Sequence, residues 1–273
     1  MKAADKIIVV TGAGNGMARE VTLELLRRGA KGVAAVDIRQ DGLDETVQLA
    51  GANGAKISTH VLDISQPDQV AALPQQVIER HGQVDGLLNI AGIIHRFARV
   101  NDLSYDEINR VFNVNLFGTM HMVKEFLPHL LERPEAQITN ISSMGSYVPV
   151  PGQTMYGASK AAVKLFTEGL RSELAGTKVG VNLVFPGAIA TNIATNSGAM
   201  TEEQMKQMAG SDLAKANKTT PVDVAGRAIV DGFESNVFHG FAGSDAKFMY
   251  RYSRLAPEAA AKLIQKQMAG LLG

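Results

Sequence analysis

Six short runs of β-branched or aliphatic residues recur along the chain, and longer segments with helical spacing of their apolar residues lie between them. The runs cover residues 7–10, 33–36, 57–62, 84–90, 138–141 and 179–184. Strands that are apolar on both faces are typical of parallel sheets that helices cover on both sides. The sequence therefore predicts a three-layer α/β fold with a doubly wound parallel sheet of about seven strands.

The length of the chain favours one domain with a sizeable core. Its 273 residues contain no repeat, low-complexity tract or linker, so we expect a single domain over residues 1–273. Residues 192–218 hold few strongly apolar side chains besides methionine, and we expect them to form a substrate lid. Residues 241–273 form a C-terminal extension. Ser104 and Glu107 have the spacing of a capping box and predict a helix start.

Composition argues against several classes of function. Lys plus Arg and Asp plus Glu both total 27, so no excess positive charge favours nucleic acid or an anionic membrane surface. The chain lacks cysteine, which excludes disulfides and thiolate catalysis and is compatible with the cytoplasm. The first apolar run, residues 7–10, is too short for a signal peptide or a membrane span. The six histidines form no HxxxH or HExxH pair, and we expect no metal site.

A glycine-rich segment follows the first apolar run. Residues 11–18 read T-G-A-G-N-G-M-A, and a helical segment comes next. Such a turn lets backbone N–H groups and the helix dipole approach a pyrophosphate, although a glycine-rich segment can also be only a tight turn. Asp37 ends the second run, near the offset at which a carboxylate accepts hydrogen bonds from the adenosine ribose; a strand-end cap is the alternative. Because a carboxylate repels a 2′-phosphate, we predict NAD, while Arg39 keeps NADP open.

A second group of polar residues predicts acid–base chemistry. Tyr156 and Lys160 are four positions apart and lie on one face of a helix. An ammonium group near a phenol, together with a positive nicotinamide ring, favours the phenolate and brings the pKa of the phenol toward neutrality. Ser143 would orient the substrate oxygen by hydrogen bonding. A Tyr-x-x-x-Lys pair alone occurs by chance in most chains, so its context decides.

These motifs together resemble the short-chain dehydrogenase/reductase family. The pattern T-G-x-x-x-G-x-[GA], a serine 13 residues before the tyrosine, and Tyr-x-x-x-Lys occur in the family's order, over about residues 6–233. The resemblance implies a Rossmann-like fold. It also implies that Tyr156 is the general acid/base, that Lys160 lowers its pKa and holds the nicotinamide ribose, and that Ser143 positions the substrate oxygen. Asn115 matches the fourth catalytic residue, which supports a proton relay.

The same resemblance assigns the cofactor site to the ends of the strands. Residues 89–92 look like the family's N-N-A-G turn with Ile90 in place of the second asparagine, and residues 186–191 match P-G-x-x-x-T. The expected cofactor-binding residues are Gly12, Asn15, Gly16, Met17, Asp37, Ile38, Asp63, Ile64, Asn89, Ala91, Gly92, Tyr156, Lys160, Pro186, Gly187, Ile189 and Thr191.

The function implied by the resemblance is an NAD-dependent oxidoreductase that interconverts a secondary alcohol and a ketone. The candidate pocket residues are mainly apolar, which favours an apolar small-molecule substrate, although methionines at helical spacing more often serve packing. They are Ile93, Ile94, His95, Met144, Tyr147, Val150, Gln153, Met200, Met205 and Met208. The alternatives are an NADP-dependent ketone or 3-oxoacyl reductase of the same family and a nucleotide-sensing protein without turnover.

The C-terminal segment needs a partner for its apolar residues. It contains a helix with Leu263, Ile264, Met268, Leu271 and Leu272 on an apolar stripe. Relatives in the family are usually dimers or tetramers, and a self-complementary interface would bury such a stripe. We therefore expect a homodimer or homotetramer, or packing against the lid. The helix has too few flanking basic residues for a membrane-surface helix.

Overall fold

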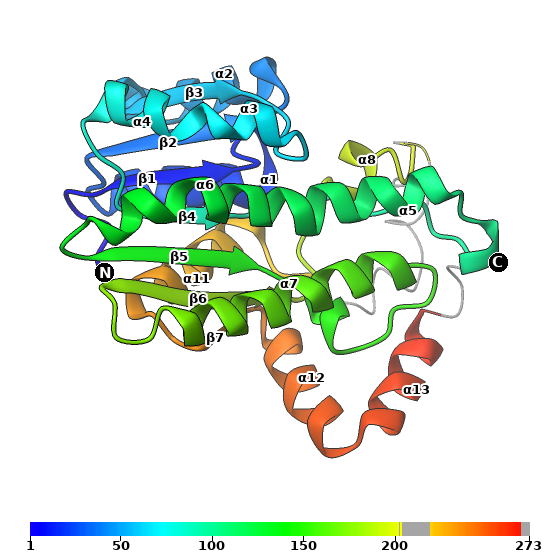
Figure 1. The fold of residues 1–273 in the computed structure, drawn as a ribbon. Coiled ribbons are helices and arrows are strands. Elements are labelled where there is room, and N and C mark those ends of the chain that lie inside the picture. Colours follow the sequence, from blue (N-terminus) through cyan, green and yellow to red (C-terminus); the bar gives the residue numbers. More distant parts are fainter. Residues whose placement is uncertain (202, 204–218, 269–273) are drawn as a thin grey trace.

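The computed structural model describes residues 1–201, 203 and 219–268. Within these ranges, seven parallel strands form one sheet in the order β3-β2-β1-β4-β5-β6-β7 (Figure 1). The strands are β1 (Ile7–Thr11), β2 (Gly32–Asp37), β3 (Ile57–Val61), β4 (Gly86–Asn89), β5 (Ala136–Ile141), β6 (Val179–Pro186) and β7 (His239–Ala242). The strand order reverses between β1 and β4, so the expected doubly wound α/β fold is confirmed. The six apolar runs are strands β1 to β6.

Helices cover both faces of the sheet. Those of the described residues are α1 (Gly16–Arg27), α2 (Gln40–Leu49), α3 (Pro67–Ala71), α4 (Leu73–His81), α5 (Tyr105–Phe112), α6 (Thr119–Leu131), α7 (Thr154–Glu173), α8 (Ile193–Asn196), α11 (Val222–Ser235), α12 (Ser244–Leu255) and α13 (Pro257–Gln267). Short 3-10 turns occur at Gly51–Lys56, Val100–Asp102 and Met144–Ser146.

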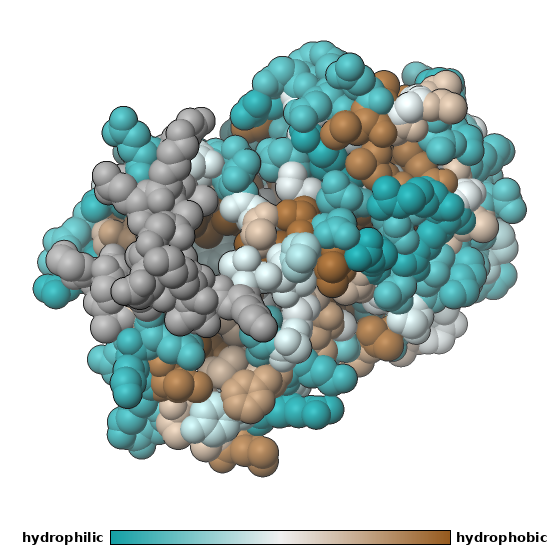
Figure 2. All heavy atoms as spheres, turned by 180° about the vertical axis from the view of Figure 1, so that it is seen from behind, coloured by the Kyte–Doolittle hydropathy of each residue, from teal (hydrophilic) through white to brown (hydrophobic). Residues whose placement is uncertain are grey.

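The strands are buried because each face carries its own apolar core. On one face, Leu25 of α1 and Phe233 of α11 pack with the strand residues Ile8 and Val10. The residues that alternate with these on the strands meet α3, α4, α6 and α7 on the other face, where Phe126 is fully buried. Figure 2 shows the molecule from behind, with hydrophilic residues over most of the visible face and smaller hydrophobic groups between them. The helices thus turn apolar sides to the sheet and polar sides outward.

Helices α5 and α6 are joined without a loop. The helix start expected at Ser104 is confirmed, because its side chain accepts from the Glu107 N–H and the Glu107 carboxylate accepts from Ser104. Residues Asn113–Gly118 then form a π-helical segment before α6 begins. A π-helical turn changes the direction in which following side chains point, and such turns often occur at functional sites.

The C-terminal region begins with a strand and ends in two helices. Strand β7 pairs in parallel with β6 through Ala242, so the structure moves the start of the extension from residue 241 to after β7. Helices α12 and α13 form a hairpin below the sheet in Figure 1. Met249 and Ile264 of this hairpin bury Val148, which follows β5. The predicted apolar stripe is therefore partly used within the molecule. The expected lid and stripe residues Met205, Met208, Leu271 and Leu272 lie outside the described residues.

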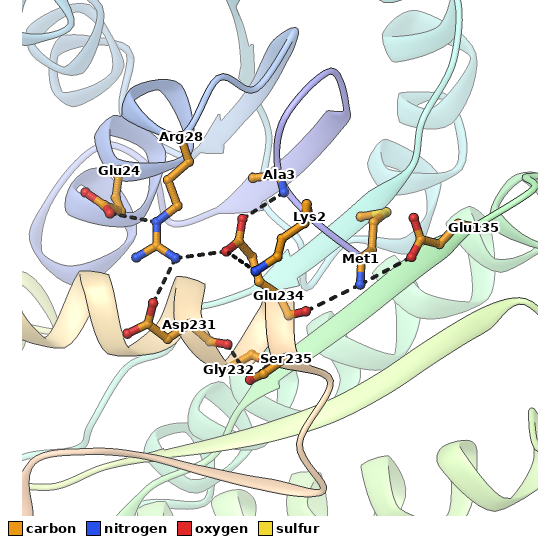
Figure 3. Close-up of polar contacts among 10 residues, drawn as sticks. All are labelled: Met1, Lys2, Ala3, Glu24, Arg28, Glu135, Asp231, Gly232, Glu234 and Ser235. Atoms are coloured by element: carbon orange, nitrogen blue, oxygen red, sulfur yellow. Dashed lines mark hydrogen bonds and ion pairs between the residues drawn. The ribbon is translucent and has the colours of Figure 1, made fainter.

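A polar network joins the N-terminal residues to α1 and α11 (Figure 3). The Glu234 carboxylate accepts from the Ala3 N–H at 2.9 Å and pairs with Arg28 at 3.1 Å and Lys2 at 3.3 Å. Arg28 also contacts Glu24 at 2.7 Å and Asp231 at 2.8 Å. These contacts hold the segment before β1 against the back of the sheet.

Candidate active site

A cavity of about 710 Å³ opens at the carboxyl ends of the central strands. This is the edge at which doubly wound sheets bind ligands, next to the point where the strand order reverses. Ten of the predicted cofactor-binding residues line it: Gly12, Asn15, Met17, Asp37, Ile38, Asp63, Ile64, Ala91, Gly92 and Thr191. Seven others do not line it: Gly16, Asn89, Tyr156, Lys160, Pro186, Gly187 and Ile189.

The glycine-rich turn requires its glycines for two reasons. Gly12 has φ +76°, and a Cβ there would lie 3.0 Å from the Ala91 Cα. A Cβ on Gly14 would lie 2.8 Å from the Asp37 carboxylate, which accepts the Gly14 N–H at 2.9 Å. Helix α1 starts at Gly16 with no acidic residue in its first turn. The turn therefore leaves backbone and a positive helix end at the cavity, which fits an anionic dinucleotide.

The carboxylate at the end of β2 is held in place by two backbone groups. Asp37 accepts hydrogen bonds from Gly14 at 2.9 Å and from Arg39 at 3.1 Å. Asp37 therefore caps two nearby backbone N–H groups, and it also lines the cavity. The Arg39 guanidinium pairs with Asp41 at 2.6 Å, and this contact raises the Arg39 pKa. Arg39, like Asp37, lines the cavity.

The end of β4 is organised by a residue that the sequence analysis left without a role. The Thr11 hydroxyl accepts from the N–H groups of Ile90 at 3.0 Å and Ala91 at 3.1 Å. The side chain of Asn89, one of the predicted cofactor-binding residues, donates to the Asn140 side-chain oxygen at 2.8 Å inside the sheet. Asn89 therefore holds two strands together.

Asn115, in the π-helical segment, brings three parts of the chain together. Its amide oxygen accepts the Ile93 N–H at 2.8 Å, and its amide nitrogen donates to the Ile93 carbonyl at 2.9 Å and to the Ser159 hydroxyl at 3.0 Å. A Cβ on Gly92 would lie 3.2 Å from the Asn115 oxygen and 3.1 Å from the Lys160 Nζ. The predicted residues Asn115, Gly92 and Lys160 thus meet at one point. Ser159 was not foreseen, although it directly precedes Lys160.

Tyr156 and Ser143 also lie together. A Cβ on Gly145 would lie 3.5 Å from the Ser143 hydroxyl and 3.7 Å from the Tyr156 ring. Burial raises the pKa of Tyr156, and a hydrogen bond with Ser143 only partly opposes this rise. The expected lowering of this pKa by Lys160 is thus not found in the protein alone, because removal of water from the phenol dominates.

Lys160 is buried next to the chain that follows β5. Its ammonium group donates to the Ile141 carbonyl at 3.0 Å, and burial lowers its pKa to about 8. Ser142 donates to the Lys160 carbonyl at 2.8 Å, which fixes this turn of α7 against the strand. The Lys160 ammonium group is therefore held in one position beside the Ile141 carbonyl.

The turn after β6 depends on residues far along the chain. The N–H of Ala188 donates to the Asp245 carboxylate at 2.7 Å, and the N–H of Gly187 donates to the Ala242 carbonyl at 2.9 Å. Thr191 follows this turn, and a Cβ on Gly16 would lie 3.9 Å from its methyl group. The glycine-rich turn before α1 and the P-G-x-x-x-T segment therefore face each other. Sequence reasoning did not identify Asp245, because only the fold brings α12 to this turn.

Comparison with known proteins agrees with this geometry. The sequence profile of the short chain dehydrogenase family matches residues 6–202. This chain belongs to the short-chain dehydrogenase family. It is 33% identical over 266 residues to SadH of Mycobacterium tuberculosis, which covers 97% of this chain and 95% of SadH. It is therefore an NAD(P)-dependent dehydrogenase or reductase.

Two solved structures resemble this dehydrogenase. A short-chain dehydrogenase/reductase from Burkholderia phymatum in complex with NAD has a TM-score of 0.83 and 26% identity, over 95% of this chain and 96% of its own. A short-chain dehydrogenase from Burkholderia cenocepacia in complex with NADP has a TM-score of 0.78 and 26% identity, over 97% of this chain and 99% of its own. Both kinds of nicotinamide cofactor thus occur among similar structures.

Among the described residues, no cluster of three or more His, Cys, Asp or Glu side chains could hold a metal ion. No helix in the described ranges is long and apolar enough to cross a membrane.

Proposed function

We propose that this dehydrogenase interconverts a secondary alcohol and a ketone, with NAD as cofactor and an otherwise apolar substrate. The observation that carries the proposal is the meeting of Asn115 and Lys160 at Gly92, a residue that lines the cavity, with Lys160 on the same helix as Tyr156. Bound nicotinamide would supply the hydride exchange and, when oxidised, a positive ring.

Tyr156 is the proposed proton donor and acceptor. Its raised pKa keeps the proton on the phenol at neutral pH, ready for transfer to the oxygen of a ketone. In the reverse direction the phenol must lose this proton, and the nearby positive charge of Lys160 then stabilises the phenolate. The Ser143 hydroxyl would hold the substrate oxygen next to the phenol.

The other site residues hold these groups in position. Asn115 fixes both backbone groups of Ile93, so the loop after β4 stays beside Lys160. Positioning of this kind contributes several kcal/mol by avoiding the entropy cost of bringing reacting groups together.

NAD is the proposed cofactor because Asp37 puts a negative charge where NADP has its 2′-phosphate. The nearby guanidinium of Arg39 is paired with Asp41, which reduces its availability for that phosphate. An NADP-dependent ketone or 3-oxoacyl reductase is the second candidate, and Arg39 is the residue that favours it.

A panel of ketones and secondary alcohols with NAD and NADP, followed by absorbance of the reduced nicotinamide, tests this function. We expect turnover with NAD, and Tyr156→Phe should lower kcat by about 10²–10⁴-fold while leaving cofactor affinity unchanged. A clear preference for NADP would show that the cofactor assignment is wrong. Turnover by Tyr156→Phe near the wild-type rate would refute the role of the phenol.

We also propose that the protein is a cytoplasmic homodimer or homotetramer. Several large apolar side chains are exposed to solvent: Phe117, Leu165, Phe238, Phe248 and Leu255. Burial between copies would remove this area from water. Light scattering at several protein concentrations measures the mass, and a monomer throughout would contradict the proposal.

A further inference from the structure

Two buried side chains, one in the loop after β4 and one directly before α7, each have a polar atom that no described residue satisfies. They are His95 and Gln153, each 4% exposed, and the atoms are Nε2 of the imidazole and Oε1 of the amide. The other two such atoms of the described residues, on Asn89 and Asn182, belong to central strands of the sheet. Buried polar atoms without a partner are rare in folded proteins because they lose their hydrogen bonds to water.

Two carbonyl groups fix how these side chains are oriented. The His95 Nδ1 lies 2.6 Å from the Arg96 carbonyl oxygen, which can only accept, so Nδ1 carries a proton. In the neutral tautomer that this contact selects, Nε2 offers a lone pair. The Gln153 amide nitrogen donates to the His95 carbonyl at 2.6 Å, which leaves its oxygen as the free group. The same contact holds the two residues together.

The pair lies beside the proposed reaction site. Gln153 directly precedes α7, and Tyr156 is one helical turn further along the chain. His95 follows Ile93, whose backbone Asn115 holds next to Lys160. A backbone hydrogen bond of 3.3 Å from Ala98 to Gly152 joins the two loops that carry His95 and Gln153.

We propose that His95 and Gln153 form a subsite that accepts hydrogen bonds from a hydroxyl or amide N–H of the substrate, at a group other than the reacting oxygen. This inference rests on the proposed function and narrows its substrate class to hydroxy ketones, diols or similar molecules on an apolar skeleton. Two acceptors repel an ether, a second carbonyl or a carboxylate at the same place. A substrate with a donor group supplies the hydrogen bonds that these two atoms lack.

Matched ketones test the subsite directly. The first set is 4-hydroxy-2-butanone, 4-methoxy-2-butanone and 2-pentanone, which place a donor, an acceptor only, or a methyl group at the same distance from the carbonyl. Corresponding sets with one methylene fewer and one more vary that distance. We expect kcat/KM for the hydroxy ketone to exceed that for the methyl ether by about 100-fold in at least one set, because a polar site left unpaired rejects the analogue.

Variants of His95 separate recognition from structure. His95→Leu removes the acceptor and should lower kcat/KM for the hydroxy ketone far more than for 2-pentanone, so that the preference falls to within about threefold. His95→Gln is the matched control, since its amide oxygen can reach the position of Nε2, and it should retain most of the preference. If His95→Leu lowers kcat/KM by the same factor for all three ketones, the role of His95 is purely structural and the subsite proposal is overturned.

A binding measurement keeps the subsite separable from the proposed chemistry. Calorimetry with Tyr156→Phe and NAD measures the affinity for the same compounds without turnover. Tighter binding of the hydroxy ketone, lost in the Tyr156→Phe/His95→Leu double variant, supports the subsite even if no ketone is reduced, which would refute the proposed function alone. Reduction of 2-pentanone without any preference for a hydroxyl in either assay overturns the subsite and leaves the function in place.

Discussion

At the scale of single residues, Lys160 carries an ionisable group that is almost fully buried, and burial disfavours its charged form. Its pKa falls to about 8 from 10.5, so the folded protein releases its proton before the unfolded chain does. Between these pH values the unfolded chain binds more protons, and the free energy of unfolding rises with pH. Between pH 8 and 10.5, we expect the free energy of unfolding of the wild type to rise by up to about 3 kcal/mol relative to that of Lys160→Met.

Urea unfolding of both proteins without cofactor, at several pH values, measures this difference. Because Tyr156 and the other titrating groups are common to both, the difference isolates Lys160. A pH-independent difference would show that the ammonium is not penalised by burial.

Asp37 and Arg39 give a second prediction at this scale. Asp37→Asn keeps an acceptor for the Gly14 N–H and removes the charge that opposes a 2′-phosphate. Asp41→Asn removes the partner that holds Arg39. We expect each change to raise affinity for NADP by about 10-fold, or about 1.4 kcal/mol. Asp37→Asn should also weaken NAD binding, because the ribose loses its carboxylate acceptor, whereas Asp41→Asn should have little effect on NAD. Calorimetric titration with each cofactor checks this, and unchanged NADP affinity in both variants would contradict it.

At the scale of elements, the π-helical segment is the join between α5, α6 and the loop after β4. Asn115→Ala leaves the Ile93 N–H and carbonyl and the Ser159 hydroxyl without their partner. We expect a loss of about 3 kcal/mol in the free energy of unfolding, together with lower kcat, since this loop borders the site. The exposed neighbour Asn113→Ala is the control for stability. Equal stability of the two variants would rule out this joining role.

The elements differ in how far their sequence predicts them. The capping box at Ser104 is a local pattern, and it was correctly predicted because all its atoms lie within four residues. The π-helical segment has no such pattern, since it depends on how Asn115 meets Ile93 and Ser159. The role of Asp245 was missed for the same reason.

At the scale of the whole molecule, the contacts of Glu234 join segments that are more than 200 residues apart. Burial raises the pKa of Glu234, but hydrogen bonds from Ala3, Lys2 and Arg28 outweigh it and leave the pKa below its usual value. Such a carboxylate stabilises the fold above its unfolded pKa, and the effect is lost as pH falls through its folded pKa.

Glu234→Gln should therefore destabilise the protein by about 2 kcal/mol at pH 7, or lower Tm by roughly 4–8 °C, and by less at pH 4, because this contribution declines below the unfolded pKa of 4.5. Glu258→Gln is the control, because its exposed pair with Lys262 contributes close to nothing. Thermal unfolding followed by circular dichroism at both pH values measures the effect. A decrease in Tm caused by Glu234→Gln that is the same at pH 4 as at pH 7 would argue against an ionic contribution.

The sequence allowed the fold class to be predicted because burial on both faces leaves a continuous apolar run at each central strand. The positions of Asp37 and Ser143 near strand ends, and of Tyr156 on a helix, followed from the same runs together with the family resemblance. The pKa of Tyr156 could not be predicted, since it depends on how much water the folded chain removes from the phenol. The direction of the Asn89 side chain depends in the same way on its neighbour Asn140.

The contact between Ala188 and Asp245 bears on the order in which the protein can be completed during synthesis. A ribosome releases the first six strands and the glycine-rich turn before it adds residue 245, so the nascent chain can form most of the sheet while the segment after β6 still lacks its carboxylate. The half of the crevice that would face nicotinamide is therefore finished last, after the half that would hold adenosine.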